Sequence, residues 1–216
     1  MSRKAFRFPL NIAMALLLPW MMSYPVTRGL LRHGVCGCLL LALFLFHHFL
    51  NVPFWVLPWR SQTKRHALLL VADILLLFDL LALIMSSLVM AGEVFSFAPF
   101  AMPWWGRGMH SSAASWCFVL SFFHLGLHGH FFWSSLHAFG KRILGRAWMT
   151  VVFSVFLTGA VFFLKSGLPN SMFFLEEVYV YPNLLLLSVS LFMTALFFSL
   201  LGRGLWILAA KNTHTS

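Results

Sequence analysis

Two pairs of histidines recur at one spacing in this chain. His33 and His47 are fourteen positions apart in HGVCGCLLLALFLFH, and His110 and His124 are fourteen apart in HSSAASWCFVLSFFH. Because an α-helix turns about 100° and rises about 1.5 Å per residue, each pair shares one helix face, about 21 Å apart along the axis. Imidazole nitrogen is a preferred ligand for iron, copper and zinc. The spacing therefore predicts two levels of metal-binding groups on two helices.

The composition places these histidines in a membrane protein. The chain has 216 residues, of which 61% are hydrophobic and 9% charged, and its mean hydropathy is +0.87. Soluble domains carry about a quarter charged residues. The formal net charge is +10, but the lysines and arginines fall in short clusters between long apolar runs, which is typical of membrane proteins rather than of nucleic-acid-binding proteins. We expect the lipid bilayer, and no nucleic acid, as a partner.

The apolar runs predict an all-α, polytopic bundle of about six transmembrane helices, since about 20 apolar residues span a bilayer. The runs cover about residues 8–24, 30–51, 67–91, 110–133, 148–165 and 184–207. The first is expected to be a retained span, because no small-residue cleavage site follows it. We expect one integral membrane domain over 1–216, with a histidine-bearing core at about 25–135 and C-terminal helices at about 146–210.

The distribution of positive charge predicts the topology. With the N-terminus inside, eleven of the fifteen lysines and arginines lie on the inner side, as the excess of positive charge on the cytoplasmic side requires. An even number of spans also leaves the C-terminus inside. The second and fourth runs then cross the membrane in the same direction.

Parallel second and fourth helices bring the histidines to matched depths. His33 and His110 lie near the outer face, and His47 and His124 near the inner face. Each pair can grip one planar ligand from both sides, as bis-imidazole ligation of haem b requires. We predict two haems b as cofactors, with these four histidines as metal ligands, forming an electron path across the bilayer.

Neighbouring residues leave alternatives open around each pair. His128 lies one turn beyond His124, and is either the deeper ligand itself or a hydrogen-bond donor to a propionate or quinone. His48 points about 100° away from His47. Arg32 and Arg107 are placed to neutralise haem propionates near the outer pair, or to anchor lipid headgroups.

The acids within spans are also candidates for function, because ionisable groups in the membrane are costly. Asp79, in the middle of the third run, is favoured over Asp73 near its edge. Its expected roles are proton uptake at a quinone site or a hydrogen bond to a ligand histidine. The alternative is a neutral acid bonded to a neighbouring helix.

Small residues near the histidines have two interpretations each. Glycines allow either a macrocycle to approach the backbone or two helices to pack closely; they are Gly34, Gly37, Gly126 and Gly129. Serines either orient the ligands or bond to their own helix; they are Ser111, Ser112 and Ser115. The three cysteines have no haem-attachment spacing and are expected to be small core residues.

The segments RHGVCG, LFHHFLN, MHSSAA and FFHLGLH resemble the paired motifs of the flavinylation-associated cytochrome b-like membrane domain of bacteria. The matched residues are His33, Gly37, His47, Asn51, Trp55, His124 and His128. The resemblance covers about residues 5–135. It departs at Gly34 and Val35, where the family carries an acidic and an aromatic residue. It implies b-type haem and transmembrane electron transfer, often beside extracytosolic flavoproteins.

Together these features predict a multi-pass cytochrome b of the bacterial inner membrane. Electrons would pass between the quinone pool, or a cytosol-facing donor, and an extracytosolic redox partner such as a flavoprotein. The chain has no dinucleotide fingerprint and no phosphate-binding loop. We therefore expect an electron-transfer subunit of a larger membrane oxidoreductase rather than a self-contained enzyme.

A metal-ion transporter with a histidine-lined path, or a structural membrane subunit, is the alternative function. Carriers tend to gather their ligands near the membrane midplane. The four histidines instead fall at two depths about 21 Å apart, which favours the cytochrome.

Overall fold

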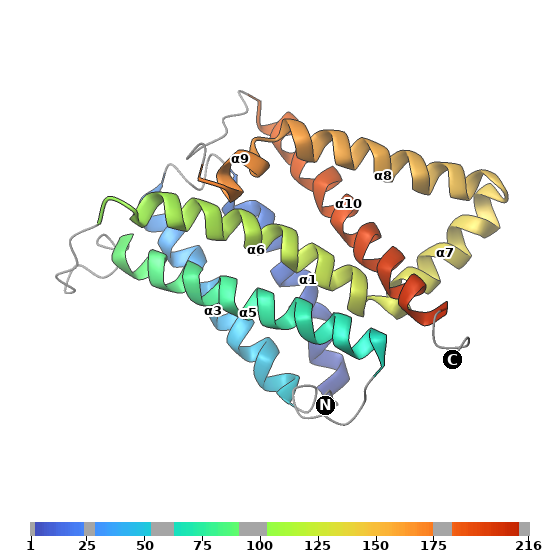
Figure 1. Cartoon of the computed structure of the whole chain (residues 1–216), viewed down its shortest axis with the longest axis horizontal. Helices are drawn as coiled ribbons and strands as arrows, with labels where there is room; N and C mark the ends of the chain where they lie inside the picture. The colour runs from blue at the N-terminus through green and yellow to red at the C-terminus, as the bar shows by residue number, and fades with distance from the viewer. Residues whose placement is uncertain (1–2, 24–28, 53–62, 91–102, 175–182, 212–216) are drawn as a thin grey trace.

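The computed structural model describes residues 3–23, 29–52, 63–90, 103–174 and 183–211, and these residues are mostly helical, with no strand among them. The helices are α1 (Arg3–Met21), α3 (Leu30–Leu50), α5 (Lys64–Met90), α6 (Gly106–His128), α7 (His130–Leu144), α8 (Ala147–Lys165), α9 (Leu168–Met172) and α10 (Leu184–Lys211). The predicted all-α fold is therefore confirmed for the described residues. Figure 1 shows the long helices side by side in a bundle, with α7 linking the end of α6 to α8.

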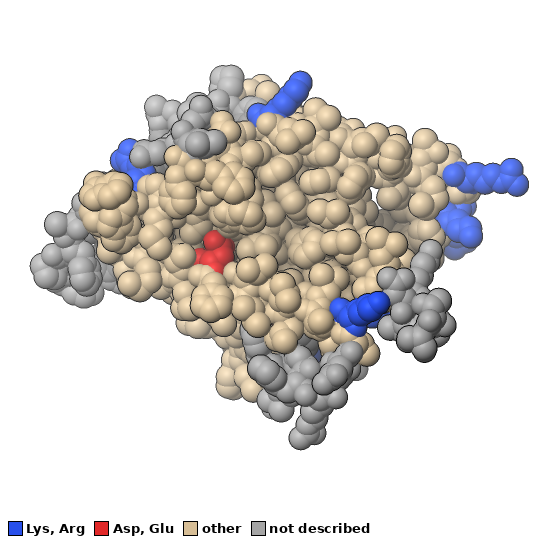
Figure 2. All heavy atoms as spheres, viewed as in Figure 1, with Lys and Arg blue, Asp and Glu red and all other residues tan. Residues whose placement is uncertain are grey.

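Four of the described helices, α3, α5, α8 and α10, are long and apolar enough to cross a membrane. Large apolar side chains on their outer faces are exposed, as contact with lipid requires; Phe78, Phe153 and Phe192 are examples. In α1 the apolar part is shorter, Phe6–Met21. In the view of Figure 2, Lys and Arg side chains lie toward the periphery, and side chains of other types cover the broad face between them.

The predicted fourth run divides into two helices. We expected one helix to about residue 133, but α6 ends at His128 and α7 begins at His130. The N–H of Gly129 bonds to the carbonyl of Leu125, and a Cβ added at Gly129 would lie 2.6 Å from that same oxygen. Gly129 is thus needed for the turn between the helices, rather than for the approach of a macrocycle.

Helix α6 lies at the centre of the bundle, between α5 and α10 (Figure 1). Gly126 faces the carbonyl of Ser199, and Gly202 of α10 faces the carbonyl of Phe123, so closely that neither position has room for a Cβ. The hydroxyl of Ser199 donates to the carbonyl of Phe122 at 3.0 Å. Small residues allow close approach of helices in membranes, and Gly126 therefore serves helix packing.

Helix α9 anchors the N-terminal half of α6. Ser112 Oγ donates to the carbonyl of Met172 at 2.8 Å, and Trp116 Nε1 donates to the same oxygen at 3.1 Å. Ser115 Oγ bonds instead to the carbonyl of Ser111 in its own helix. Ser115 thus has the second of its two expected roles, a bond within its own helix, whereas Ser112 has neither and joins α6 to α9.

Helices α1 and α3 form the other side of the bundle and pack as an antiparallel pair. Arg7 Nη2, near the start of α1, donates to the carbonyl of Leu50 at the end of α3 (2.6 Å). At the other end, a Cβ added at Gly37 would lie 3.6 Å from Met21 Cε, which is ordinary contact. This pairing holds α3 opposite α6 and leaves space between them.

Candidate histidine site

At the level predicted to be the outer one, His33 of α3 lies next to His110 of α6. Their ring centroids lie 5.8 Å apart, and the ring planes are inclined at 74°. On α5, Ser86 Oγ and Ser87 Oγ lie 3.5 and 3.3 Å from His110 Nδ1. Both hydroxyls donate to the carbonyl of Leu83, so their lone pairs face the imidazole. This places the proton on His110 Nδ1 and leaves Nε2 as the basic nitrogen.

At the level predicted to be the inner one, α1, α3, α5 and α6 enclose a cavity of about 220 Å³. Its polar and ionisable lining includes Arg7, Asn11, His47, His48, Asp73, His124 and His128. His47 and His124 therefore reach one cavity from α3 and α6. Because the outer pair and the inner pair meet at opposite ends of these helices, α3 and α6 run in the same direction.

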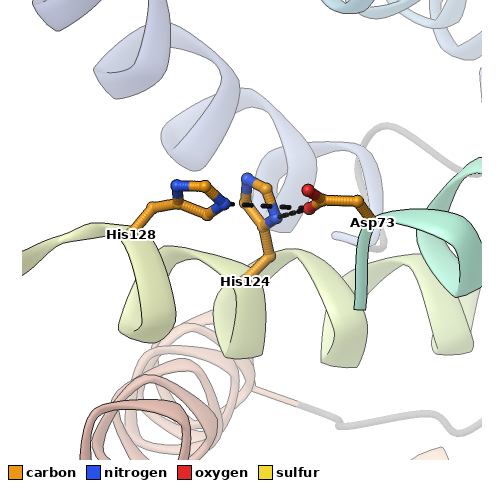
Figure 3. A group of neighbouring side chains, drawn as sticks. All are labelled: Asp73, His124 and His128. Atoms are coloured by element: carbon orange, nitrogen blue, oxygen red, sulfur yellow. Dashed lines mark ion pairs between the residues drawn. The ribbon is translucent and has the colours of Figure 1, made fainter. Parts of the chain in front are cut away.

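A group of three ionisable side chains forms one wall of this cavity (Figure 3). His124 Nδ1 lies 2.6 Å from Asp73 Oδ1, and His128 Nε2 lies 3.8 Å from the same oxygen. The two imidazole centroids are 4.3 Å apart. One donor atom from each residue lies within 4.8 Å of the others, so this group can hold a metal ion. Asp73 is buried, with 5% of its surface exposed.

Both inner histidines engage an oxygen through Nδ1. His47 Nδ1 lies 2.9 Å from Asn11 Oδ1, and His124 Nδ1 faces the Asp73 carboxylate. Histidine ligands of metals almost always donate their second ring N–H to such an acceptor. With the proton on Nδ1, the Nε2 lone pair of each ring is available for ligation.

The remaining predicted site residues occupy other positions. His48 lines the cavity, and its Nδ1 lies 2.9 Å from the carbonyl of Phe44, one turn earlier in α3. Arg32 and Arg107 are exposed near the starts of α3 and α6. The Arg32 guanidinium lies back over Gly29.

The sequence favoured Asp79 over Asp73, but the structure places Asp73 among the histidines. The predicted depths of the residues in the membrane could have indicated that Asp73 lies near His124. Asp73 lies six residues from the inner end of the third run, and His124 lies nine from the inner end of the fourth, a difference of about 4–5 Å.

Sequence reasoning also missed Asn11, Ser86 and Ser87. Each of these side chains lies on a helix next to that of a histidine and contacts the Nδ1 atom of its ring. The sequence carried only a weak signal for Asn11, as a polar residue within an apolar run. The serines form the pair SS near the end of the third run, which in antiparallel packing reaches the start of the fourth.

The described residues thus define an all-helical bundle with four candidate membrane-spanning helices and histidines at two levels, one of them with a buried carboxylate. The chain matches no protein-family model, no curated protein and no solved structure.

Proposed function

We propose that this protein is a dihaem cytochrome b of the bacterial inner membrane. The observation that carries the proposal is the meeting of α3 and α6 histidines at two separate levels: His33 faces His110, and His47 shares a cavity with His124. Two parallel helices with ligands at both ends are the arrangement that two stacked bis-imidazole haems need.

His33 and His110 would hold one haem iron between their rings. Metal–imidazole bonds are about 2.0 Å long, so two rings sharing one axial metal have centroids roughly 6 Å apart. The observed centroid distance is 5.8 Å. The inclination of the two ring planes would not prevent this, since each ring would only have to direct one nitrogen at the iron.

The inner pair fits the same chemistry through its nitrogens. Asn11 and Asp73 engage Nδ1 of His47 and His124, which leaves Nε2 of each for the iron. His128 turns Nε2 toward Asp73 instead. This favours His124 over His128 as the inner ligand on α6.

When bound, the haems supply one-electron carriers at two depths of the membrane. The chain's own residues hold and orient the ligands, and apolar side chains such as Leu18, Phe44 and Phe122 limit water at the inner level. Under this proposal the six long helices, α1, α3, α5, α6, α8 and α10, all cross the bilayer, with both termini inside. Quinone or a cytosol-facing donor would react near the inner level, and an extracytosolic redox protein, such as a flavoprotein, near the outer level.

A second candidate function is the handling of a divalent metal ion. It is favoured by one observation, the grouping of Asp73, His124 and His128, because two imidazoles and a carboxylate suit zinc and similar ions. It leaves the second level, His33 with His110, without a role.

Spectroscopy and metal analysis of the purified full-length protein distinguish the two candidates. The cytochrome predicts b-type reduced-minus-oxidised bands and two haems per chain by pyridine haemochrome. A colourless protein from haem-sufficient cells that retains stoichiometric zinc, copper or nickel would contradict the cytochrome and support metal-ion handling.

A further inference from the structure

We infer that Asp73 is a positioning residue that directs His124 Nε2 into the inner site and strengthens it as an electron-donating ligand. This inference rests on the proposed function. It starts from the 2.6 Å contact between Asp73 Oδ1 and His124 Nδ1, which joins α5 to α6 beside the cavity. Figure 3 shows both imidazoles of α6 beside this carboxylate.

The carboxylate controls which nitrogen of His124 carries the proton. An ionised carboxylate only accepts hydrogen bonds, so the imidazole proton must lie on Nδ1. The basic lone pair then lies on Nε2. The buried state of Asp73 matters here, because a hydrogen bond in a medium of low dielectric constant is electrostatically stronger than in water.

The negative charge also changes the electronic character of the ligand. A histidine that donates to a carboxylate is a more basic ligand than one that donates to a neutral group. It favours the oxidised, more positively charged state of the metal and lowers its reduction potential. Asp73 is therefore expected to lower the potential of the inner haem.

The other ligands with described Nδ1 contacts have neutral partners. His47 faces the amide oxygen of Asn11, and His110 faces the hydroxyls of Ser86 and Ser87. Among the described residues, Asp73 is thus the only carboxylate in contact with any of the four predicted ligands. Arg7 brings an opposite charge to the same cavity, so the contribution of Asp73 is measured by substitution rather than from the absolute potential.

A role confined to packing makes a different prediction from a positioning role. Asp73→Asn keeps the size of the side chain and an oxygen that can accept from His124 Nδ1, but removes the charge. Asp79→Asn is the matched control, because it makes the same substitution six residues further along the same helix, outside the histidine cluster.

The test is an optical redox titration of the purified full-length protein and both variants. The inner haem is identified as the component that His47→Ala removes. We expect Asp73→Asn to retain both haems and to shift the midpoint of the inner haem to a higher potential, with the outer haem unchanged. The low-spin ferric electron paramagnetic resonance signal of the inner haem should change with it. Asp79→Asn should leave both midpoints in place.

Other outcomes separate a positioning role of Asp73 from a packing role. Equal midpoints in Asp73→Asn and the wild type, or equal shifts of both haems, would overturn it while the cytochrome assignment stands. If Asp73→Asn loses the inner haem, Asp73→Glu must restore it; loss in both variants would assign Asp73 to packing. A wild-type protein without haem would overturn the proposed function, and this inference with it.

Discussion

The two histidine levels differ in the groups that α5 brings to them. At the outer level, α5 presents the hydroxyls of Ser86 and Ser87 to His110. At the inner level, α5 presents the carboxylate of Asp73 to His124. Asp73 lies thirteen residues before Ser86 in this helix. Because α5 runs antiparallel to α6, its two ends meet the two levels with different chemistry. A repeated histidine spacing thus gives two levels that are alike in their histidines and different in their surroundings.

A second difference lies in the space around the ligands. The inner level has a cavity with Arg7, Asn11, His48 and His128 in its lining. Its charged and polar groups come from α1, α3 and α6 as well as from α5. The inner histidines therefore share their cavity with polar and charged groups from four helices.

The largest effect expected is the loss of one level without the other. His124→Ala should halve the haem content and spare the outer haem, and His110→Ala should spare the inner haem. His128→Ala should retain both haems, because His128 turns toward Asp73. Pyridine haemochrome assays with difference spectra measure this. If His124→Ala retained both haems while His128→Ala lost one, the assignment of the inner ligand would be wrong.

The second-largest effect is expected from a change in the packing of α6, the helix that carries one histidine of each level. Gly126→Ala places a Cβ against the carbonyl of Ser199, and overpacking of this kind costs about 1–3 kcal/mol. Gly204→Ala on α10 meets nothing within 4 Å, and should be neutral or stabilising by up to about 1 kcal/mol through helix propensity. Thermal unfolding in detergent, followed by circular dichroism, should show a lower midpoint for Gly126→Ala alone.

The haem spectrum of Gly126→Ala tests which of the two levels depends more on this packing. Gly126 lies two residues from His124, so displacement of α6 should reach the inner level before the outer one. An equal loss of stability in Gly126→Ala and Gly204→Ala would contradict the close packing of α6 against α10.

The long helices and the sharing of a face by the histidines were predictable from sequence, because both follow from local apolar runs and the helical repeat. The choice between Asp73 and Asp79 was not. Helix α5 is apolar around most of its circumference, so its periodicity does not show which side faces α6. The role of Gly126 likewise depends on where α10 lies. The turn at Gly129 was missed because apolar residues continue on both sides of it.

A smaller effect is expected from changing the neutral partner of His47. Asn11→Asp replaces the amide oxygen near His47 Nδ1 with a carboxylate. By the argument made for Asp73, it should lower the potential of the inner haem, opposite in sign to Asp73→Asn, and leave the outer haem unchanged. Redox titration measures the sign. An unchanged inner potential in Asn11→Asp would show that the ligand on α3 does not respond to the charge of its partner, and a higher one would contradict the predicted sign.

The smallest effect is expected at the outer level, where the contacts to His110 Nδ1 are 3.5 and 3.3 Å long. The double substitution Ser86→Ala and Ser87→Ala removes both hydroxyls, and neutral hydrogen bonds contribute about 0.5–1.5 kcal/mol each. We expect both haems to be retained, with a small change confined to the outer ferric resonance signal. Ser115→Ala, which removes a hydroxyl bonded within α6, is the control and should change neither signal. A change in the inner signal would mean that α5 transmits the substitution along its length, and that the two levels are coupled rather than independent.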